Sequence, residues 1–496
     1  MITLGIILAS YNLIYHILTM YQQEHYDYIK LLKSYKTLYL KKIYMYIMYL
    51  IVILLILNIQ YIKILILLLG ITSLILKRKY IIPLKLTKRI VRLIMTSLVI
   101  YSCIYLLTLN NLIFILLILA YPFTIYLINL INYPIERIIR NYYIKLAKQK
   151  LRQNKNLKII TITGSYGKTT TKNIIKHLAE DKYITLATPK SYNTIMGICK
   201  IINNNLTNLT EILIVEVGAN HPNEIQKIKK MLNPDISIIT EIGAQHISTF
   251  KTITNVFKSK LEIINFDKPT SITIVNNDNI YLKHLNIPNK ILYKVGINYN
   301  EDIYVNNINI QNNHMNFTIC DKSKTLNIST KLLGRHNINN ILLAYKVAKL
   351  LNIHPQDIVN KLSTISPIEN RLEYKQNNNL HIYNDSYNSN LIGFKNAIDL
   401  ISYSNLTKII ITPGIVDGGI TEETQNTEIA NYIVQKSIDM VYLIKNKTTK
   451  YYIKKLSNYR VFNSFIDAYN HLIKTYNEEE VCVLIENDLP DNYFER

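Results

Sequence analysis

The segment from Lys158 to Thr171, KIITITGSYGKTTT, decides how the rest of the chain folds. Residues 158–162 have the composition of a buried strand, and residues 171–179 have that of a helix. A turn containing Gly164 and Gly167 lies between them. A strand, a glycine-rich turn and a helix form the setting in which backbone N–H groups bind phosphate. The segment therefore predicts a phosphate-binding loop at the edge of an α/β sheet.

The side chains of this loop suit a nucleotide together with a divalent cation. Lys168 can reach the β- and γ-phosphates, and the Thr169 hydroxyl can bind Mg²⁺. The G-x-x-G-K-T spacing is shorter than the general G-x-x-x-x-G-K-[ST] pattern, so the alternative is a glycine turn followed by Lys-Thr by chance. We expect the nucleotide to contact Gly164, Ser165, Gly167, Lys168, Thr169 and Thr170.

Three further apolar runs follow, at residues 211–217, 235–240 and 271–275. They alternate with helical segments, which is typical of a doubly wound parallel sheet. Ligands bind such sheets at the carboxyl ends of the strands. Four polar residues lie at or just beyond these ends and are expected to face one site: Glu216, Glu241, His246 and Asn276.

The pattern divides this part of the chain into two α/β domains. Residues 157–333 are expected to form the nucleotide-binding domain, with a β subdomain in the strand-rich tail from about residue 281. Residues 334–496 are expected to form a smaller Rossmann-like domain with a helix at 337–351 and strands at 408–412 and 481–486. The nucleotide would then lie between the two domains, and their closure would complete the site.

The N-terminal third differs in composition from the rest of the chain. The chain of 496 residues has a net charge of +23, and residues 1–158 contain 21 lysines and arginines against three acidic residues. These charges separate apolar runs, which favours a membrane rather than a nucleic acid as partner. The four cysteines are dispersed, so neither a disulfide framework nor a zinc cluster is expected.

The apolar runs predict a membrane domain over residues 1–131, because a helix needs about 20 apolar residues to cross a bilayer. The alternative, a buried helical core, is disfavoured because these helices have almost no charged face. Five spans are expected, near residues 1–20, 43–59, 61–76, 90–109 and 112–131, the third being short enough for a hairpin or a re-entrant segment.

The loops between these spans predict their orientation. Basic residues are concentrated at 21–42 and 77–89, which places both loops in the cytoplasm under the positive-inside rule. Five crossings then put everything after residue 132 on the inner side of the cytoplasmic membrane. Residues 132–156 alternate apolar with basic positions and predict an amphipathic linker helix at the inner membrane surface.

Over residues 157–496 the chain resembles the Mur ligases, a family that joins a carboxylate to an amine with ATP while building cell-wall peptides. The resemblance rests on an ordered set of motifs: TGSYGKTTT (163–171), Tyr192-Asn193-Thr194 with Gly197, Glu216-Val217-Gly218-Ala219, Ile242-Gly243-Ala244-Gln245-His246, Lys258-Ser259-Lys260-Leu261-Glu262, Val275-Asn276-Asn277-Asp278, Gly334-Arg335-His336-Asn337 with Asn340 and Ala344, Asn370-Arg371-Leu372-Glu373, and Asn384-Asp385-Ser386-Tyr387-Asn388-Ser389-Asn390.

The resemblance implies an acyl phosphate that is attacked by an amine, with ATP and two Mg²⁺ ions. It implies metal binding by Thr169, Glu216, His246 and a carbamylated Lys260, and catalytic roles for Lys168, Lys260, His246 and Glu216. Implied nucleotide contacts beyond the loop are Asn276, Asp278, Asn337, Arg371 and Asp385. Weaker substrate-side candidates are Asn193, Thr194, Tyr387, Asn388 and Asp417.

The segment Asp385–Asn390 is typical of the subfamily that adds D-alanyl-D-alanine to a UDP-muramoyl tripeptide. Two features depart from that subfamily. A membrane domain replaces the usual UDP-sugar domain, and the segments Thr412–Asp417 and Glu486–Pro490 resemble a membrane-linked branch. The alternatives are therefore a ligase for a lipid-linked or pseudomurein-type peptide, a polyglutamate- or cyanophycin-type ligase, or, in another class, a membrane transporter or sensor with a P-loop ATPase.

Overall fold

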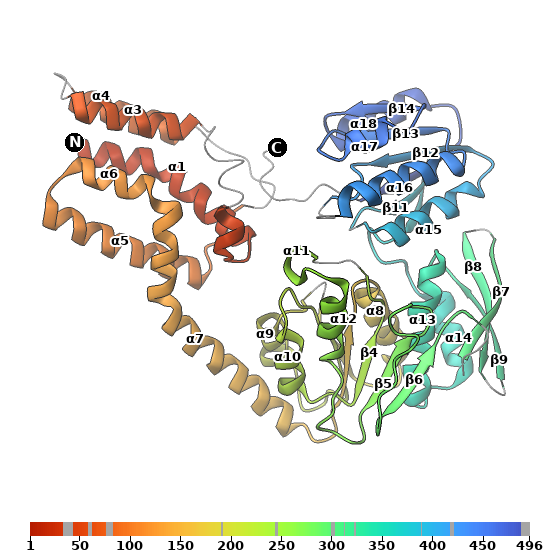
Figure 1. The fold of residues 1–496 in the computed structure, drawn as a ribbon. Helices are drawn as coiled ribbons and strands as arrows, with labels where there is room; N and C mark the ends of the chain where they lie inside the picture. The colour runs from red at the N-terminus through yellow and green to blue at the C-terminus, as the bar shows by residue number, and fades with distance from the viewer. Residues whose placement is uncertain are drawn as a thin grey trace. The chain divides into compact units, whose positions relative to one another are not determined.

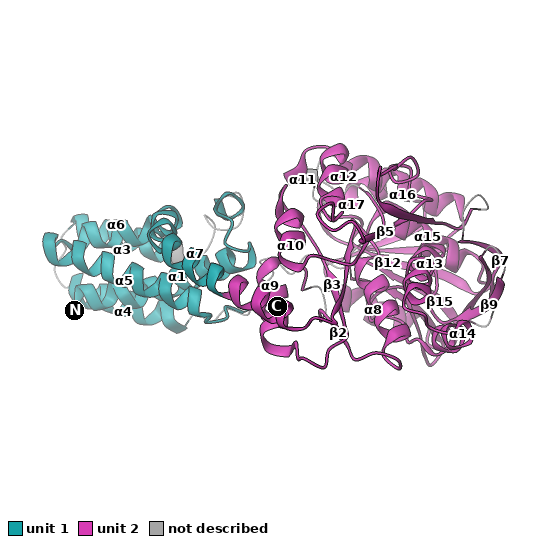
Figure 2. Cartoon of the chain, turned by 90° about the horizontal axis from the view of Figure 1, so that it is seen from below, with its two compact units in different colours: residues 1–142, 490–496 teal, residues 143–489 magenta. Residues whose placement is uncertain are grey.

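The computed structural model describes residues 1–32, 43–57, 62–75, 83–189, 192–243, 247–298, 303–311, 313–321, 324–387, 389–416 and 421–487. The described residues divide into two compact units, one within residues 1–142 and one within residues 143–487 (Figure 2). The first unit is helical, and the second contains three β-sheets with their covering helices (Figure 1). This is the predicted fold class: a helical part followed by α/β domains.

Apolar side chains hold the helical unit together. Its elements are α1 (Ile2–Gln23), α3 (Ile43–Leu57), α4 (Ile62–Ile75), α5 (Lys88–Thr108), α6 (Asn111–Leu119) and the first part of α7 (Tyr121–Gln153). Helices α1 and α4 approach closely because Gly70 of α4 faces Gly5 of α1 without a side chain between them. Small residues at helix contacts are typical of packing in membranes, where close backbone approach replaces the hydrophobic effect.

The described residues contain fewer spanning helices than predicted. By length and composition α1 and α5 could cross a membrane, while α4 and the described part of α3 are shorter apolar helices. The span predicted near residues 112–131 is not one continuous helix, since α6 and α7 meet at a bend of 82°. The pair would give a third span only if it is counted as one broken helix. Pro122 accounts for the break, because it has no N–H to donate to the carbonyl of Ile118.

Helix α7 runs without interruption from Tyr121 to Gln153, so the predicted linker at 132–156 continues the helix that begins in the apolar region. Polar contacts tie α7 to α5 near this transition. Arg92 donates to Glu136 at 2.6 Å, and Thr96 donates to Asn132 at 3.1 Å. These contacts place the first basic residues of α5 beside the middle of α7.

A six-stranded parallel sheet forms the centre of the second unit. Its strands are ordered β2-β3-β1-β4-β5-β6, with bounds β1 (Lys158–Thr163), β2 (Thr185–Ala187), β3 (Ile212–Glu216), β4 (Ile236–Ile239), β5 (Ile272–Asn276) and β6 (Ile291–Val295). Helices α8 (Lys168–Ala179), α9 (Ile195–Asn205), α10 (Glu224–Leu232), α11 (Ile247–Phe250) and α12 (Ile253–Leu261) connect the strands. Ile160 packs in the core that contains α8, whereas Ile159 packs in the core that contains α9 and α10, so both faces of the sheet are buried.

The predicted β subdomain is a three-stranded antiparallel sheet of β7 (Ile303–Gln311), β8 (His314–Asp321) and β9 (Lys324–Thr330). Strand β6 lies within the same predicted region but joins the parallel sheet instead. Helix α13 (Arg335–Leu350) packs against α8, and α14 (Pro355–Thr364) packs against β9 and α8. These two helices therefore link the central sheet to the chain that follows.

The last sheet also has six strands, in the order β10-β11-β15-β12-β13-β14. All neighbours are parallel except the β10–β11 pair. The strands are β10 (Glu373–Asn377), β11 (Leu380–Asp385), β12 (Thr407–Thr412), β13 (Met440–Ile444), β14 (Tyr459–Phe462) and β15 (Val481–Glu486), and the helices are α15 (Leu391–Ser402), α16 (Glu422–Gln435), α17 (Thr449–Ile453) and α18 (Phe465–Thr475). Strands β11 and β15 are adjacent and parallel, so their carboxyl ends lie together.

The glycine contact between α1 and α4 makes a testable prediction. A Cβ at Gly70 would lie 2.5 Å from the carbonyl oxygen of Gly5, so Gly70→Leu must separate the two helices. We expect this substitution to lower the free energy of unfolding of the full chain in detergent by about 1–3 kcal/mol. Leu68→Val on an exposed part of α4 is the control and should change it little. Equal stability of the two variants would contradict the packing.

Candidate active site

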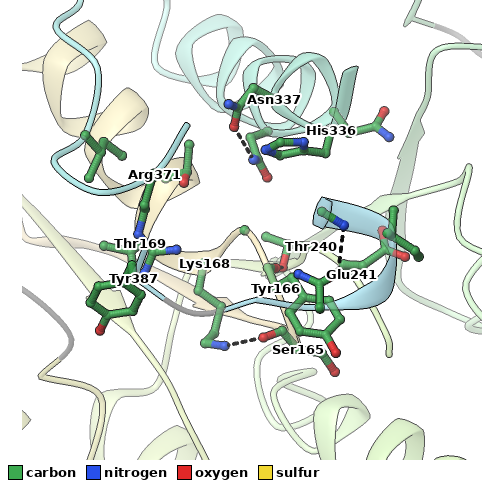
Figure 3. Close-up of a pocket in the computed structure, with 18 of the residues that line it drawn as sticks. Ser165, Tyr166, Lys168, Thr169, Thr240, Glu241, His336, Asn337, Arg371 and Tyr387 are labelled. Carbon is green, nitrogen blue, oxygen red and sulfur yellow. Dashed lines mark hydrogen bonds between the residues drawn. The ribbon is translucent and has the colours of Figure 1, made fainter. Parts of the chain in front are cut away.

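A cavity of about 240 Å³ lies at the carboxyl end of the central sheet (Figure 3). The phosphate loop, the ends of β3 and β5, and the segment after β4 contribute one part of its lining. The start of α13 and residues beside β10 and β11 contribute the other part. Both α/β sheets of the second unit thus supply side chains to one cavity.

Two glycines give the loop its shape. Gly164 has φ +151° and Gly167 has φ +79°, and α8 begins immediately afterwards at Lys168. A Cβ on Gly164 would collide with the Thr240 hydroxyl, so that position has no room for a side chain. The loop is also tied to the segment after β4, because the Ser165 N–H donates to the carbonyl of Glu241 at 2.6 Å. The N-terminus of α8, with its free N–H groups, is thereby held at the cavity.

Lys168 is positioned by the loop itself. Its ammonium donates to the carbonyl oxygens of Gly164 at 2.7 Å and Ser165 at 2.9 Å (Figure 3). Burial lowers the pKa of Lys168 to about 8, while Glu216 raises it and Arg371 lowers it further. A lysine in this position is close to the loop N–H groups and can add positive charge where a phosphate binds.

Glu216 ends β3 with its carboxylate buried, at 2% side-chain exposure. One oxygen, Oε2, accepts a hydrogen bond from the Thr169 hydroxyl at 2.8 Å and faces the Lys172 ammonium at 3.4 Å. The other oxygen accepts from the Asn193 amide at 3.3 Å. Two donors from α8 and one from the loop before α9 therefore satisfy a carboxylate that would be costly to bury alone.

A second acidic residue, Glu241, lies beyond the end of β4. Its carboxylate accepts from Asn276 at 2.9 Å and from Asn279 at 2.5 Å. Burial raises the pKa of Glu241, and these two amides oppose that rise. The ring of Tyr166 packs against Gly243 in the same region, and burial raises its pKa to about 12.

Lys260 lies in the last turn of α12 and is 2% exposed. Burial lowers the pKa of its amine to about 7, the nearby Lys168 lowers it further, and Glu262 and Glu224 raise it. The side chain is not among those that line the cavity. Its electrostatic coupling to Lys168 nevertheless places it near the phosphate loop.

The second half of the cavity contains Arg371, whose guanidinium lies over the Tyr387 ring at 4.1 Å from its centroid. The Asp385 carboxylate accepts from the Leu372 N–H at 3.1 Å. Burial raises the pKa of Asp385 to about 6, and Arg371 opposes the rise. His336 lines the cavity, and its buried Nδ1 has no hydrogen-bond partner among the described residues. Burial together with Arg371 lowers the pKa of His336 to about 4.

The structure brings most of the predicted site residues to the cavity. Those that line it are Ser165, Gly167, Lys168, Thr169, Thr170, Asn193, Glu216, Asn276, Asn337, Arg371, Asp385 and Tyr387. Gly164 shapes the loop without lining the cavity, and Lys260 does not line it either. His246, Asn388 and Asp417 are outside the described residues.

Two predicted residues are placed elsewhere. The Asp278 carboxylate accepts from the Ile297 N–H and the Asn298 amide, both at 2.8 Å, so it fixes the chain after β6. Thr194 caps α9 by accepting from the Gly197 N–H at 3.3 Å. Neither lines the cavity.

Several residues at the site were not in the predicted set: Lys172, Tyr166, Thr240, His336 and Asn340. His336 and Asn340 stood inside a quoted motif without an assigned role. Lys172 could have been found from its spacing, because residues four apart share one face of a helix and Lys172 follows Lys168 by four.

The residues present fit Mg²⁺ bound together with a nucleotide. The described part of the chain contains no group of three His, Cys, Asp or Glu side chains that could hold a metal. Mg²⁺ is typically held by one or two carboxylates, with water and substrate phosphates completing its shell. Glu216 supplies one carboxylate beside the phosphate loop, and the hydroxyl of Thr169 supplies a further oxygen.

Comparisons with known proteins agree with this geometry. Residues 162–348 match the Mur ligase middle domain. A UDP-N-acetylmuramoyl-tripeptide–D-alanyl-D-alanine ligase of Buchnera aphidicola is 27% identical over 354 residues, which cover 70% of this chain and 77% of that protein. The enzyme of the same name from Bacillus subtilis is 30% identical over 303 residues, covering 60% of this chain and 65% of that protein.

The fold is likewise that of a solved relative. The MurF ligase of Thermotoga maritima, crystallised in complex with ADP, superposes with a TM-score of 0.65 at 20% identity, covering 70% of this chain and 80% of that one. The family match, the sequence relatives and the phosphate-loop cavity lead to one conclusion. The chain belongs to the Mur ligase family of ATP-dependent peptide ligases of cell-wall synthesis.

Proposed function

We propose that this chain joins the amine of D-alanyl-D-alanine to the carboxylate of a muramoyl tripeptide precursor and converts ATP to ADP and phosphate. The relatives that carry this activity in their names support the choice of substrates. The segment Asp385–Asn390, typical of that subfamily, supports it as well, because Asp385, Tyr387 and Asn390 line the cavity.

The reaction proceeds in two transfers. The acceptor carboxylate attacks the γ-phosphorus of ATP, and ADP leaves with the electrons of the broken P–O bond. The neutral amine nitrogen then attacks the acyl carbon, the bond from that carbon to the phosphate oxygen breaks, and the nitrogen loses one proton as phosphate departs, leaving the amide N–H. The protein contributes chiefly by positioning the groups and neutralising their charge.

The contact of Thr169 with Glu216 inside the cavity is the observation that carries this proposal. In the proposed reaction, the phosphate loop and Glu216 bind the nucleotide phosphates and their metal ion. Lys168 and the N–H groups at the start of α8 face the phosphates, and Arg371 and Asp385 contact the nucleotide from the other side. Bound Mg²⁺ supplies further neutralisation of phosphate charge.

The second metal position is proposed for His246 and a carbamylated Lys260. Carbamate formation requires a neutral amine, which adds to CO₂ and releases one proton. Burial gives Lys260 that property, since its pKa of about 7 leaves much of the amine neutral near neutrality. The product is an anion, which also suits a position electrostatically coupled to Lys168.

The helical unit is proposed to anchor the ligase in the cytoplasmic membrane. Helices α1 and α5 are long and apolar enough to cross it. The basic residues before α3 and before α5 favour a cytoplasmic position for both of these loops. In this proposal α5 leaves the cytoplasm, and the bent pair α6–α7 crosses the membrane back, so that the ligase domains are cytoplasmic.

A coupled assay tests the proposed activity. Full-length protein in detergent should release phosphate only when ATP, the UDP-muramoyl tripeptide and D-alanyl-D-alanine are all present. Lys168→Ala should lower the rate by about 10²–10³-fold, because it removes charge from the phosphate site. Lys176→Ala, on an exposed part of the same helix, is the matched control. Phosphate release that ignores the amine, or full turnover by Lys168→Ala, would contradict the proposal.

The carbamate makes a separate prediction. In ¹³C NMR with labelled bicarbonate held constant, a carbamate signal should increase as pH rises through about 7, because the Lys260 amine loses its proton there. Lys260→Met should lack the signal, and Lys258→Met, exposed two residues earlier, should retain it. A signal that persists in Lys260→Met would assign the modification to another lysine.

A further inference from the structure

A buried ion pair adjoins the proposed nucleotide site. Lys172 lies in α8 one turn beyond Lys168, and its ammonium is 3.4 Å from Oε2 of Glu216. The two side chains are 1% and 2% exposed. The same oxygen accepts a hydrogen bond from the hydroxyl of Thr169. Thr169 is the other proposed ligand of this metal ion. Lys172 thus contacts the very oxygen that a cation at this site would use.

Lys172 is the lysine that pairs with Glu216, although two others lie near. The Lys168 ammonium donates to the carbonyls of Gly164 and Ser165 instead. Lys260 lies on α12 and does not line the cavity. The Arg371 guanidinium stacks on a tyrosine ring. Removing Lys172 would therefore take away the ion-pair partner of this buried carboxylate.

The energetic role of Lys172 changes with what the site contains. Without a ligand, its charge offsets the cost of burying the Glu216 carboxylate. With a divalent cation on Glu216, the ammonium would be a like charge on the same carboxylate and would repel that cation. Nucleotide phosphates bring the negative charge that offsets this repulsion.

We propose that Lys172 is an internal counter-ion that makes Glu216 bind a divalent cation together with nucleotide phosphates and only weakly without them. The inference rests on the proposed nucleotide and metal site. It gives Lys172 a positioning role: the residue suppresses nucleotide-free metal binding and keeps the carboxylate paired when the site is empty.

Mn²⁺ binding, measured by electron paramagnetic resonance on the full-length protein in detergent, tests this role. Lys172→Met removes the charge and retains most of the apolar stem. We expect it to bind nucleotide-free Mn²⁺ at least about tenfold more tightly than the wild type. The gain should be smaller when a non-hydrolysable ATP analogue is present, because the phosphates then offset the charge of Lys172 in the wild type.

Three further variants make the result specific. Lys176→Met removes an exposed lysine one turn later in α8 and should bind Mn²⁺ as the wild type does. Lys172→Arg keeps the charge and should retain weak nucleotide-free binding. Lys172→Gln also removes the charge, and the result expected for it is the same as for Lys172→Met. It replaces Lys172→Met if thermal unfolding shows that Lys172→Met does not fold.

The outcomes separate this inference from the proposed function. Equal nucleotide-free Mn²⁺ affinity in the Lys172→Met and Lys176→Met variants would overturn the counter-ion role. The proposed site would survive that result if Glu216→Gln still loses the Mn²⁺ bound with the analogue. A wild type that binds no Mn²⁺ even with the analogue would overturn both. A melting temperature that falls without ligand in Lys172→Met and is recovered by Mn²⁺ alone would support the inference.

Discussion

A carboxylate buried at the end of a strand needs positive charge or hydrogen-bond donors beside it. Glu216 is such a carboxylate, and the residues around it in the ligase unit supply these partners. Strand β3 lies parallel to β1, with Glu216 in register with Ile162, so the phosphate loop starts beside the carboxylate. The helix that follows the loop then carries Thr169 and Lys172 to the same oxygen. A single strand pairing thereby joins the nucleotide loop, the proposed metal ligands and the buried ion pair.

Much of this arrangement could be predicted from the sequence because it depends on local patterns. Glycines at 164 and 167 followed by Lys168 identify a loop whose geometry is set by backbone sterics. Apolar runs ending at polar residues locate the strand ends, and parallel pairing brings those ends to one edge. Glu216, Glu241 and Asn276 line the cavity, as expected for polar residues at the carboxyl ends of parallel strands.

Other features depend on contacts that a linear pattern does not contain. Asp278 lies two residues beyond Asn276 at the same strand end, yet its carboxylate accepts hydrogen bonds from Ile297 and Asn298, just after β6. The sequence does not distinguish Lys172 from other helix lysines. Only the structure shows that the Glu216 carboxylate, at the end of β3, lies beside its ammonium. The break between α6 and α7 arises at Pro122 within an apolar run that composition alone treats as one span.

The proposed reaction requires a nucleotide's terminal phosphate and a metal ion to meet at Glu216. Anomalous diffraction from crystals of the full chain with Mn²⁺ and a non-hydrolysable ATP analogue can locate both groups. We expect a manganese peak in contact with the Glu216 carboxylate, the Thr169 hydroxyl and the terminal phosphate. Analogue phosphates bound away from the loop at 164–169, or manganese bound away from Glu216, would contradict it.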